Sequence, residues 1–107
     1  MTTPRLTVAM AVYNNGPYVG EAIDSICTQS FGDFEFLIVN DGSTDGSAEV
    51  IDARAAADNR IRVIHQENRG FIASLNRMFD EAQSGWIARM DGDDISAPDR
   101  LARQVAY

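Results

Sequence analysis

The chain of 107 residues is long enough for one domain with a hydrophobic core, and its single cysteine, Cys27, excludes an internal disulfide and fits a reducing compartment. Nine basic and sixteen acidic residues give a formal net charge of −7 without any basic block, which argues against nucleic acid as a partner. No run approaches the ~20 apolar residues of a membrane-spanning helix, and residues 1–5 lack the apolar segment of a signal peptide, so we expect a cytoplasmic location.

Strands and helices are predicted to alternate along the whole chain. In chain order they are a strand at residues 6–12, a helix at 17–27, a strand at 34–39, a helix at about 47–57, a strand at 61–64, a helix at 71–82, a strand at 86–90 and a last helix from Pro98 that is still running at Tyr107. This alternation predicts an α/β fold, a mostly parallel sheet with helices on both faces joined by right-handed crossovers.

Apolar periodicity assigns the predicted core. Pro17 is expected to be the first residue of its helix, and Cys27 falls on the apolar face of that helix, so we interpret it as a core residue rather than a nucleophile. The helix at 71–82 is the most clearly amphipathic, and its aromatic residues and methionine are expected in the core. The apolar faces of these two helices consist of Tyr18, Val19, Ala22, Ile23, Ile26 and Cys27, and of Phe71, Ile72, Leu75, Met78, Phe79 and Ala82.

Polar side chains follow each predicted strand at the point where it ends. They are Tyr13 and Asn14 after the first strand, Asp41 after the second, His65, Asn68 and Arg69 after the third, and Asp91, Asp93 and Asp94 after the fourth. Because the carboxyl ends of parallel strands share one edge of a sheet, and ligands bind there where the strand order reverses, we expect these residues to converge on one crevice.

The three carboxylates of residues 91–94 predict a metal site. Like charges this close raise one another's proton affinity, and a divalent cation between them relieves the repulsion. Oxygen-only ligands suit Mg²⁺ or Mn²⁺. The alternative is a solvated turn that closes the strand, because Asp and Gly are ordinary turn residues.

The neighbouring polar residues fit a nucleoside diphosphate that carries a leaving group. Asp41 is suited to accept hydrogen bonds from a base or a ribose, and the planar guanidinium of Arg69 to hold a phosphate or base carbonyls. Tyr13 offers a ring for base stacking. The alternatives are a surface arginine and a tyrosine at the rim of the core. A bound metal would stabilise the charge on the departing diphosphate.

Four spaced motifs resemble the family 2 glycosyltransferases, which have the GT-A nucleotide-sugar-binding fold. They are Val12-Tyr13-Asn14, Val39-Asn40-Asp41-Gly42-Ser43-Thr44-Asp45, Asn68-Arg69-Gly70 with Asn76, and Asp91-Gly92-Asp93-Asp94 followed by Pro98-Asp99-Arg100-Leu101. The resemblance implies that Asp91 and Asp93 form the DxD element, with Asp93 as the direct metal ligand and Asp91 nearer the ribose or the metal. It implies a nucleotide, usually UDP or dTDP, held by the residues Val12, Tyr13, Asn14, Asp41, Asn68, Arg69 and Asp91. Ser74-Leu75 departs from the family's usual Ala-Arg.

The resemblance also implies what the chain does. Residues 1–107 would be the nucleotide-sugar-binding half of a transferase, which holds the donor with Mn²⁺ or Mg²⁺ and passes the sugar to a carbohydrate or lipid-linked acceptor, including one at the inner face of the membrane. Such enzymes invert the anomeric centre, and the general base is expected beyond Tyr107.

Other functions fit the same residues less well. An EF-hand, a dinucleotide-dependent oxidoreductase and a P-loop nucleotidase each lack their motif, whereas a nucleotidyltransferase stays a mechanistic neighbour, although the chain has no lysine for its phosphate loop. A non-catalytic sugar-nucleotide-binding or self-associating module is the remaining alternative. We expect a homo-oligomer to form through the surface that an acceptor-binding half would cover.

Overall fold

The structure, a computed structural model, describes residues 4–105 and contains the eight expected elements in alternation. They are β1 (Leu6–Val12), α1 (Gly16–Cys27), β2 (Phe34–Asp41), α2 (Ser47–Ala57), β3 (Ile61–Gln66), α3 (Phe71–Glu81), β4 (Ile87–Asp91) and α4 (Arg100–Val105). Within the described residues, no helix combines the length and the apolar character needed to cross a membrane.

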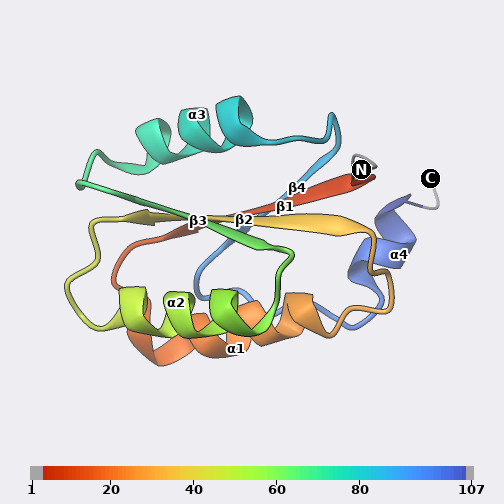
Figure 1. The fold of residues 1–107 in the computed structure, drawn as a ribbon, viewed down its shortest axis with the longest axis horizontal. Coiled ribbons are helices and arrows are strands. Elements are labelled where there is room, and N and C mark those ends of the chain that lie inside the picture. Colours follow the sequence, from red (N-terminus) through yellow and green to blue (C-terminus); the bar gives the residue numbers. More distant parts are fainter. Residues whose placement is uncertain (1–3, 106–107) are drawn as a thin grey trace.

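The four strands form one parallel sheet in the order β3-β2-β1-β4. The chain moves outward from β1 through β2 to β3 and then returns to the other side of β1 to form β4, so the strand order reverses between β1 and β4. Helices α1 and α2 cover one face of the sheet and α3 covers the other (Figure 1). The predicted α/β fold class is therefore confirmed.

The core has two unequal parts, one on each face of the sheet. Under α1 and α2, large side chains such as Met10, Phe36 and Ile23 are completely buried, and Leu101 of α4 joins them. Under α3 the fully buried cluster is much smaller and consists of Ala9, Leu37, Val39 and Met78. All eight residues of β2 are buried, as expected for a strand covered on both faces.

Two strands are longer than the sequence predicted. β2 continues through Asn40 and Asp41, and β3 continues through His65 and Gln66, because these residues pair in register, Asn40 with His65 and Asp41 with Gln66. The turn residues therefore extend the ladder before the chain leaves it, and Asp41 lies on a rigid strand rather than in a loop.

Two helix starts also differ from the prediction. α1 begins at Gly16, so Pro17 lies within its first turn. α4 begins at Arg100 rather than Pro98, after a turn in which the Arg100 N–H donates to the Ala97 carbonyl over 3.0 Å. The predicted continuation of this helix to Tyr107 lies outside the described residues.

The aromatic residues of α3 were wrongly assigned to the core. Phe71 is 50% exposed and Phe79 60%, whereas Met78 is only 2% exposed. Helix α3 contacts the sheet through a narrow strip in which Ser74 and Met78 are buried and Leu75 is partly buried. Phe71 and Phe79 lie outside that strip and remain exposed. Tyr18 and Trp86, at 58% and 61% exposure, are likewise outside the core.

Cys27 behaves as the sequence predicted. It is half-buried against the α1 side of the core. Burial, and then the neighbouring Asp58 carboxylate, raise the pKa of its thiol to about 12. A thiol with such a pKa carries almost no thiolate at neutral pH and is a poor nucleophile.

Candidate functional site

A cleft of about 490 Å³ lies at the carboxyl ends of the strands, beside the start of α3. This volume falls within the range of small-molecule sites. Its lining residues are Ala11, Val12, Tyr13, Asn15, Asp41, Asn68, Gly70, Phe71, Ser74, Asp91 and Asp93. The cleft therefore brings Asp41 from β2 together with Asp91 and Asp93 at the end of β4, as the topology predicted.

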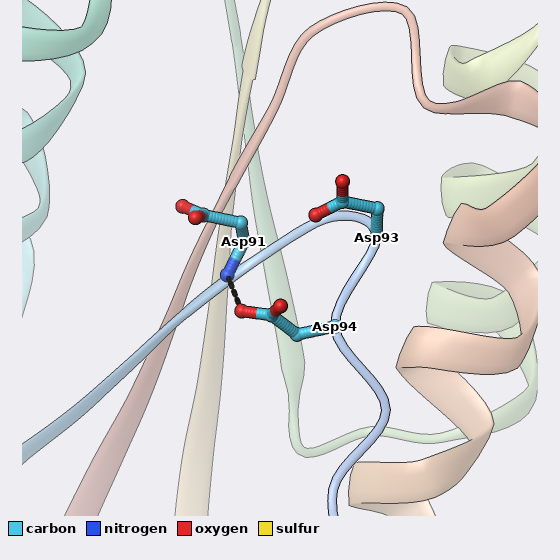
Figure 2. A group of neighbouring side chains, drawn as sticks. All are labelled: Asp91, Asp93 and Asp94. Carbon is cyan, nitrogen blue, oxygen red and sulfur yellow. Dashed lines mark hydrogen bonds between the residues drawn. The ribbon is translucent and has the colours of Figure 1, made fainter.

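The acidic turn after β4 places three exposed carboxylates close together. One oxygen from each of Asp91, Asp93 and Asp94 lies within 4.8 Å of the others. Figure 2 shows that the Asp94 carboxylate points back to the backbone of Asp91, where its Oδ2 accepts a hydrogen bond from the Asp91 N–H over 3.0 Å. Asp91 and Asp93 line the cleft and Asp94 does not. The turn-closing alternative therefore describes Asp94, whereas the other two carboxylates face the cleft.

Gly92, between the two cleft-facing carboxylates, lies tightly against β1 and the start of α1. Its N–H donates to the Ala11 carbonyl over 3.0 Å, which extends the β1–β4 contact by one hydrogen bond. A Cβ at this position would lie 2.6 Å from Oδ1 of Asn15, so only glycine fits without moving that side chain. The turn is thus held against β1 while its flanking carboxylates stay exposed. Their all-oxygen donor set fits Mg²⁺ or Mn²⁺.

Asp41 is 5% exposed and already accepts three hydrogen bonds. Its Oδ1 accepts from Nε2 of Gln66 over 2.9 Å and from the Arg69 N–H over 2.8 Å, and its Oδ2 accepts from the Gly70 N–H over 3.0 Å. Burial opposes ionisation of this carboxyl, but the hydrogen bonds from Arg69, Gln66 and Gly70 outweigh it and lower the pKa of Asp41 below its ordinary value. Asp41 is therefore a fixed, ionised acceptor in the cleft wall.

Besides Asp94, three other residues expected in the crevice do not line it, and two of these three lie in the surrounding loops. Arg69 contacts Asp41 through its backbone N–H, and its side chain is exposed. Asn14, at φ 52°, joins two loops, because its N–H donates to Oγ of Ser43 and its Oδ1 accepts from the Thr44 N–H.

His65, the third of these residues, lies on the opposite face of the sheet from the cleft, which corrects the expected convergence. Its Nδ1 is 3.0 Å from Nδ2 of Asn40, and its Nε2 is 2.9 Å from Oδ1 of Asp52 in α2. Successive residues of a strand point to opposite faces, so Gln66 rather than His65 is directed toward Asp41.

Sequence reasoning missed four side chains in or beside the cleft. Phe71 was assigned to the core, yet it lines the cleft with the Arg89 guanidinium 5.3 Å from its ring centre. Ser74 is 1% exposed, and its hydroxyl accepts a hydrogen bond from Gln66. The side chain of Asn15 lies directly against Gly92. The departure of Ser74 from the family's usual alanine was a signal for that residue. No pattern in the sequence pointed to Gln66, because its role depends on strand register.

Comparison with known proteins gives consistent matches. The model of the family described as "Glycosyl transferase family 2" matches residues 7–107. The glycosyltransferase GlyG of Streptococcus pneumoniae is 41% identical over 91 residues, which cover 84% of this chain and 30% of GlyG. The chain thus spans about a third of the length of such relatives.

Two solved structures share the fold over nearly the whole chain. The mannosyltransferase PcManGT from Pyrobaculum calidifontis, in complex with GDP-Man and Mn²⁺, superposes with a TM-score of 0.87 at 28% identity, covering 98% of this chain and 32% of PcManGT. Residues 1–349 of TarS from S. aureus, in complex with UDP-GlcNAc, superpose with a TM-score of 0.87 at 24% identity, covering 95% of this chain and 30% of that one. The fold is that of the GT-A glycosyltransferases, and the chain belongs to glycosyl transferase family 2.

Proposed function

We propose that the chain forms the donor-binding part of a glycosyltransferase and binds a nucleotide-diphosphate sugar in the cleft. The observation that carries the proposal is that Asp41, Asp91 and Asp93 all line the same cleft. Family membership supports it, as does PcManGT, whose structure holds GDP-Man and Mn²⁺. The relatives, which are named as glycosyltransferases, do not favour a non-catalytic module.

The two ends of the cleft would hold different parts of the donor. Asp41 would accept a hydrogen bond from the base, with Tyr13 and Phe71 offering exposed rings to stack on it. A carboxylate offers about four acceptor positions, and three of those on Asp41 are occupied. The position that remains suits the single imide N–H of uracil or thymine, and we therefore propose UDP- or dTDP-sugars as donors.

The acidic end of the cleft would hold the diphosphate. Asp91 and Asp93 supply carboxylate oxygens that fit Mn²⁺ or Mg²⁺, and a bound ion would neutralise charge that develops on the leaving diphosphate. We propose that Asp93 is a direct ligand and that Asp91 shares the ion or binds the ribose. Asp94 closes the turn by accepting a hydrogen bond from the Asp91 N–H.

The remaining steps of transfer are assigned to the whole protein. We propose that transfer inverts the anomeric carbon and that the general base lies outside these 107 residues. Among the carboxylates of the cleft, Asp41 has both acceptor positions of its Oδ1 occupied by hydrogen bonds, and Asp91 and Asp93 are assigned to the diphosphate. A carbohydrate or lipid-linked acceptor, used in the cytoplasm or at the inner face of the membrane, completes the proposal.

Calorimetric titration with UDP, with and without Mn²⁺, tests the donor site. We expect UDP binding that tightens at least about tenfold with Mn²⁺, and loss of that increment in Asp93→Asn, because one carboxylate oxygen ligand becomes a neutral amide. Asp80→Asn, which removes the same charge from an exposed position on α3, should behave as the wild type. Equal binding with and without Mn²⁺, or an unaltered Asp93→Asn variant, would contradict the proposal.

A further inference from the structure

Gln66 donates a side-chain hydrogen bond to Asp41, the carboxylate that is proposed above to accept from the base. Its Nε2 donates to Oδ1 of Asp41 over 2.9 Å and to Oγ of Ser74 over 3.2 Å. The parallel register pairs Asp41 with Gln66 at the last position of both strands, so the backbone holds the two side chains side by side. The other two donors to Asp41 are the backbone N–H groups of Arg69 and Gly70.

The position of the Gln66 amide is fixed from both sides. Turning the amide over would place its oxygen against the Asp41 carboxylate, which is unfavourable because both groups are acceptors. Ser74 is 1% exposed, and its hydroxyl donates to the Gly70 carbonyl over 3.2 Å while it accepts from Gln66. This arrangement leaves the Gln66 N–H groups directed at Asp41 and Ser74.

The hydrogen bonds divide unequally between the two carboxylate oxygens of Asp41. Oδ1 accepts from Gln66 and from the Arg69 N–H, which fills its two lone pairs, whereas Oδ2 accepts only from the Gly70 N–H. A base with one imide N–H needs only the free position on Oδ2. Guanine presents two adjacent N–H donors, and a carboxylate can pair with both only when each oxygen has a free position.

We propose that Gln66 determines base specificity by filling Oδ1 of Asp41, so that the cleft accepts uracil or thymine and discriminates against guanine. The inference rests on the donor site proposed above and adds a residue that does not itself touch the donor. Gln66 is the one side-chain donor among the three, and it is therefore the position at which a substitution can change the number of free acceptors without altering the backbone.

Parallel calorimetric titrations with UDP and GDP in the presence of Mn²⁺ test this assignment in the wild type and in Gln66→Leu. We expect the wild type to bind UDP at least about tenfold tighter than GDP, because an unpaired buried N–H of guanine is costly. In Gln66→Leu, the ratio of the two affinities should fall about tenfold, mainly through tighter GDP binding, because Oδ1 regains a free position.

Two further variants separate specificity from folding. Ser74→Ala removes the second anchor of the Gln66 amide and should lower the UDP-to-GDP ratio in the same direction by a smaller factor, about threefold. This variant carries the test if Gln66→Leu fails to fold. Gln83→Leu, the same substitution at an exposed glutamine next to the far end of the sheet, should leave the ratio unchanged.

The outcomes distinguish this inference from the proposed function. A wild type that binds UDP and prefers it to GDP, with an unchanged ratio in Gln66→Leu and Ser74→Ala, overturns the inference alone. The same holds if both affinities fall by the same factor, which would indicate a purely structural role. A wild type that binds GDP as tightly as UDP overturns the inference and the proposed choice of a UDP- or dTDP-sugar, but not the donor site itself. A wild type that binds neither nucleotide overturns the donor site and the inference together.

Discussion

Gly42 shows how a single residue sets the shape of the cleft. It follows Asp41 directly and has a φ of +74°, a conformation that glycine adopts without steric cost. A Cβ here would lie 2.7 Å from the backbone nitrogen of Asn68, a residue that lines the cleft. The close approach of the two loops, as well as the dihedral angle, therefore requires glycine.

Substitution of Gly42 should cost more stability than substitution of a glycine that has only an unusual dihedral angle. We expect Gly42→Ala to lower the free energy of unfolding by about 3 kcal/mol, combining the left-handed backbone with an overlap against backbone atoms that cannot rotate away. Gly46→Ala is the matched control, because Gly46 has a left-handed backbone with a φ of +95° but a Cβ there would meet only Oε2 of Glu49, at 3.9 Å, and it should cost about 1 kcal/mol. Urea denaturation measures both values, and equal losses would show that the close approach is unimportant.

At the residue scale, the sequence predicted the carboxylates of the cleft but not the groups that hold them. Asp41, Asp91 and Asp93 could be placed because each follows an apolar strand, and the ends of parallel strands share an edge. The sequence could not show that Gln66 faces Asp41 while His65 faces away. That outcome depends on where β3 ends and therefore on pairing across the sheet.

At the scale of elements, all eight were predictable, whereas their ends and exposures were less so. Helix α3 illustrates the limit, because its spacing identified an apolar side but not the width of the surface that would cover it. Only a narrow strip around Ser74 and Met78 meets the sheet. Ile72 and Phe79 lie seven residues apart, two helical turns along one side of α3, and are 68% and 60% exposed.

This exposed side of α3 predicts self-association. Burial of these exposed apolar side chains against a second copy of the chain would lower the free energy of the pair. We expect Phe79→Glu to shift the sedimentation of concentrated protein toward the monomer, with a loss of stability within about 0.5 kcal/mol because the side chain is already exposed. Tyr18→Glu, at a 58% exposed aromatic residue of α1, serves as the control and should not alter the distribution. A wild type that sediments as a monomer at high concentration would contradict the prediction.

At the scale of the whole molecule, buried and half-buried carboxylates join segments that are distant in sequence. Glu35 of β2 accepts hydrogen bonds from Thr7 of β1, from Arg62 of β3 and from the Gln83 N–H after α3. Asp58, before β3, pairs with Arg60 over 2.7 Å, and the Arg60 guanidinium also donates to the Cys27 carbonyl at the end of α1. These two carboxylates and their arginine partners thus connect strands and helices that are far apart in the sequence.

Protonation of these carboxylates should destabilise the fold in acid. Hydrogen bonding to Arg60, opposed by burial, lowers the pKa of Asp58 from 3.8 to about 2, which corresponds to about 2 kcal/mol of stability. Because the folded-state value is the lower one, this stability is fully present above pH ~4 and is lost as the pH falls toward ~2.

We expect Asp58→Asn to lower the unfolding free energy by about 2 kcal/mol at pH 7 and to converge with the wild type near pH 2. Asp99→Asn, in an exposed pair with Arg103, should follow the wild type at every pH. Urea denaturation between pH 2 and 7 measures these curves, and parallel curves for Asp58→Asn and the wild type would show that this ion pair does not carry the acid sensitivity.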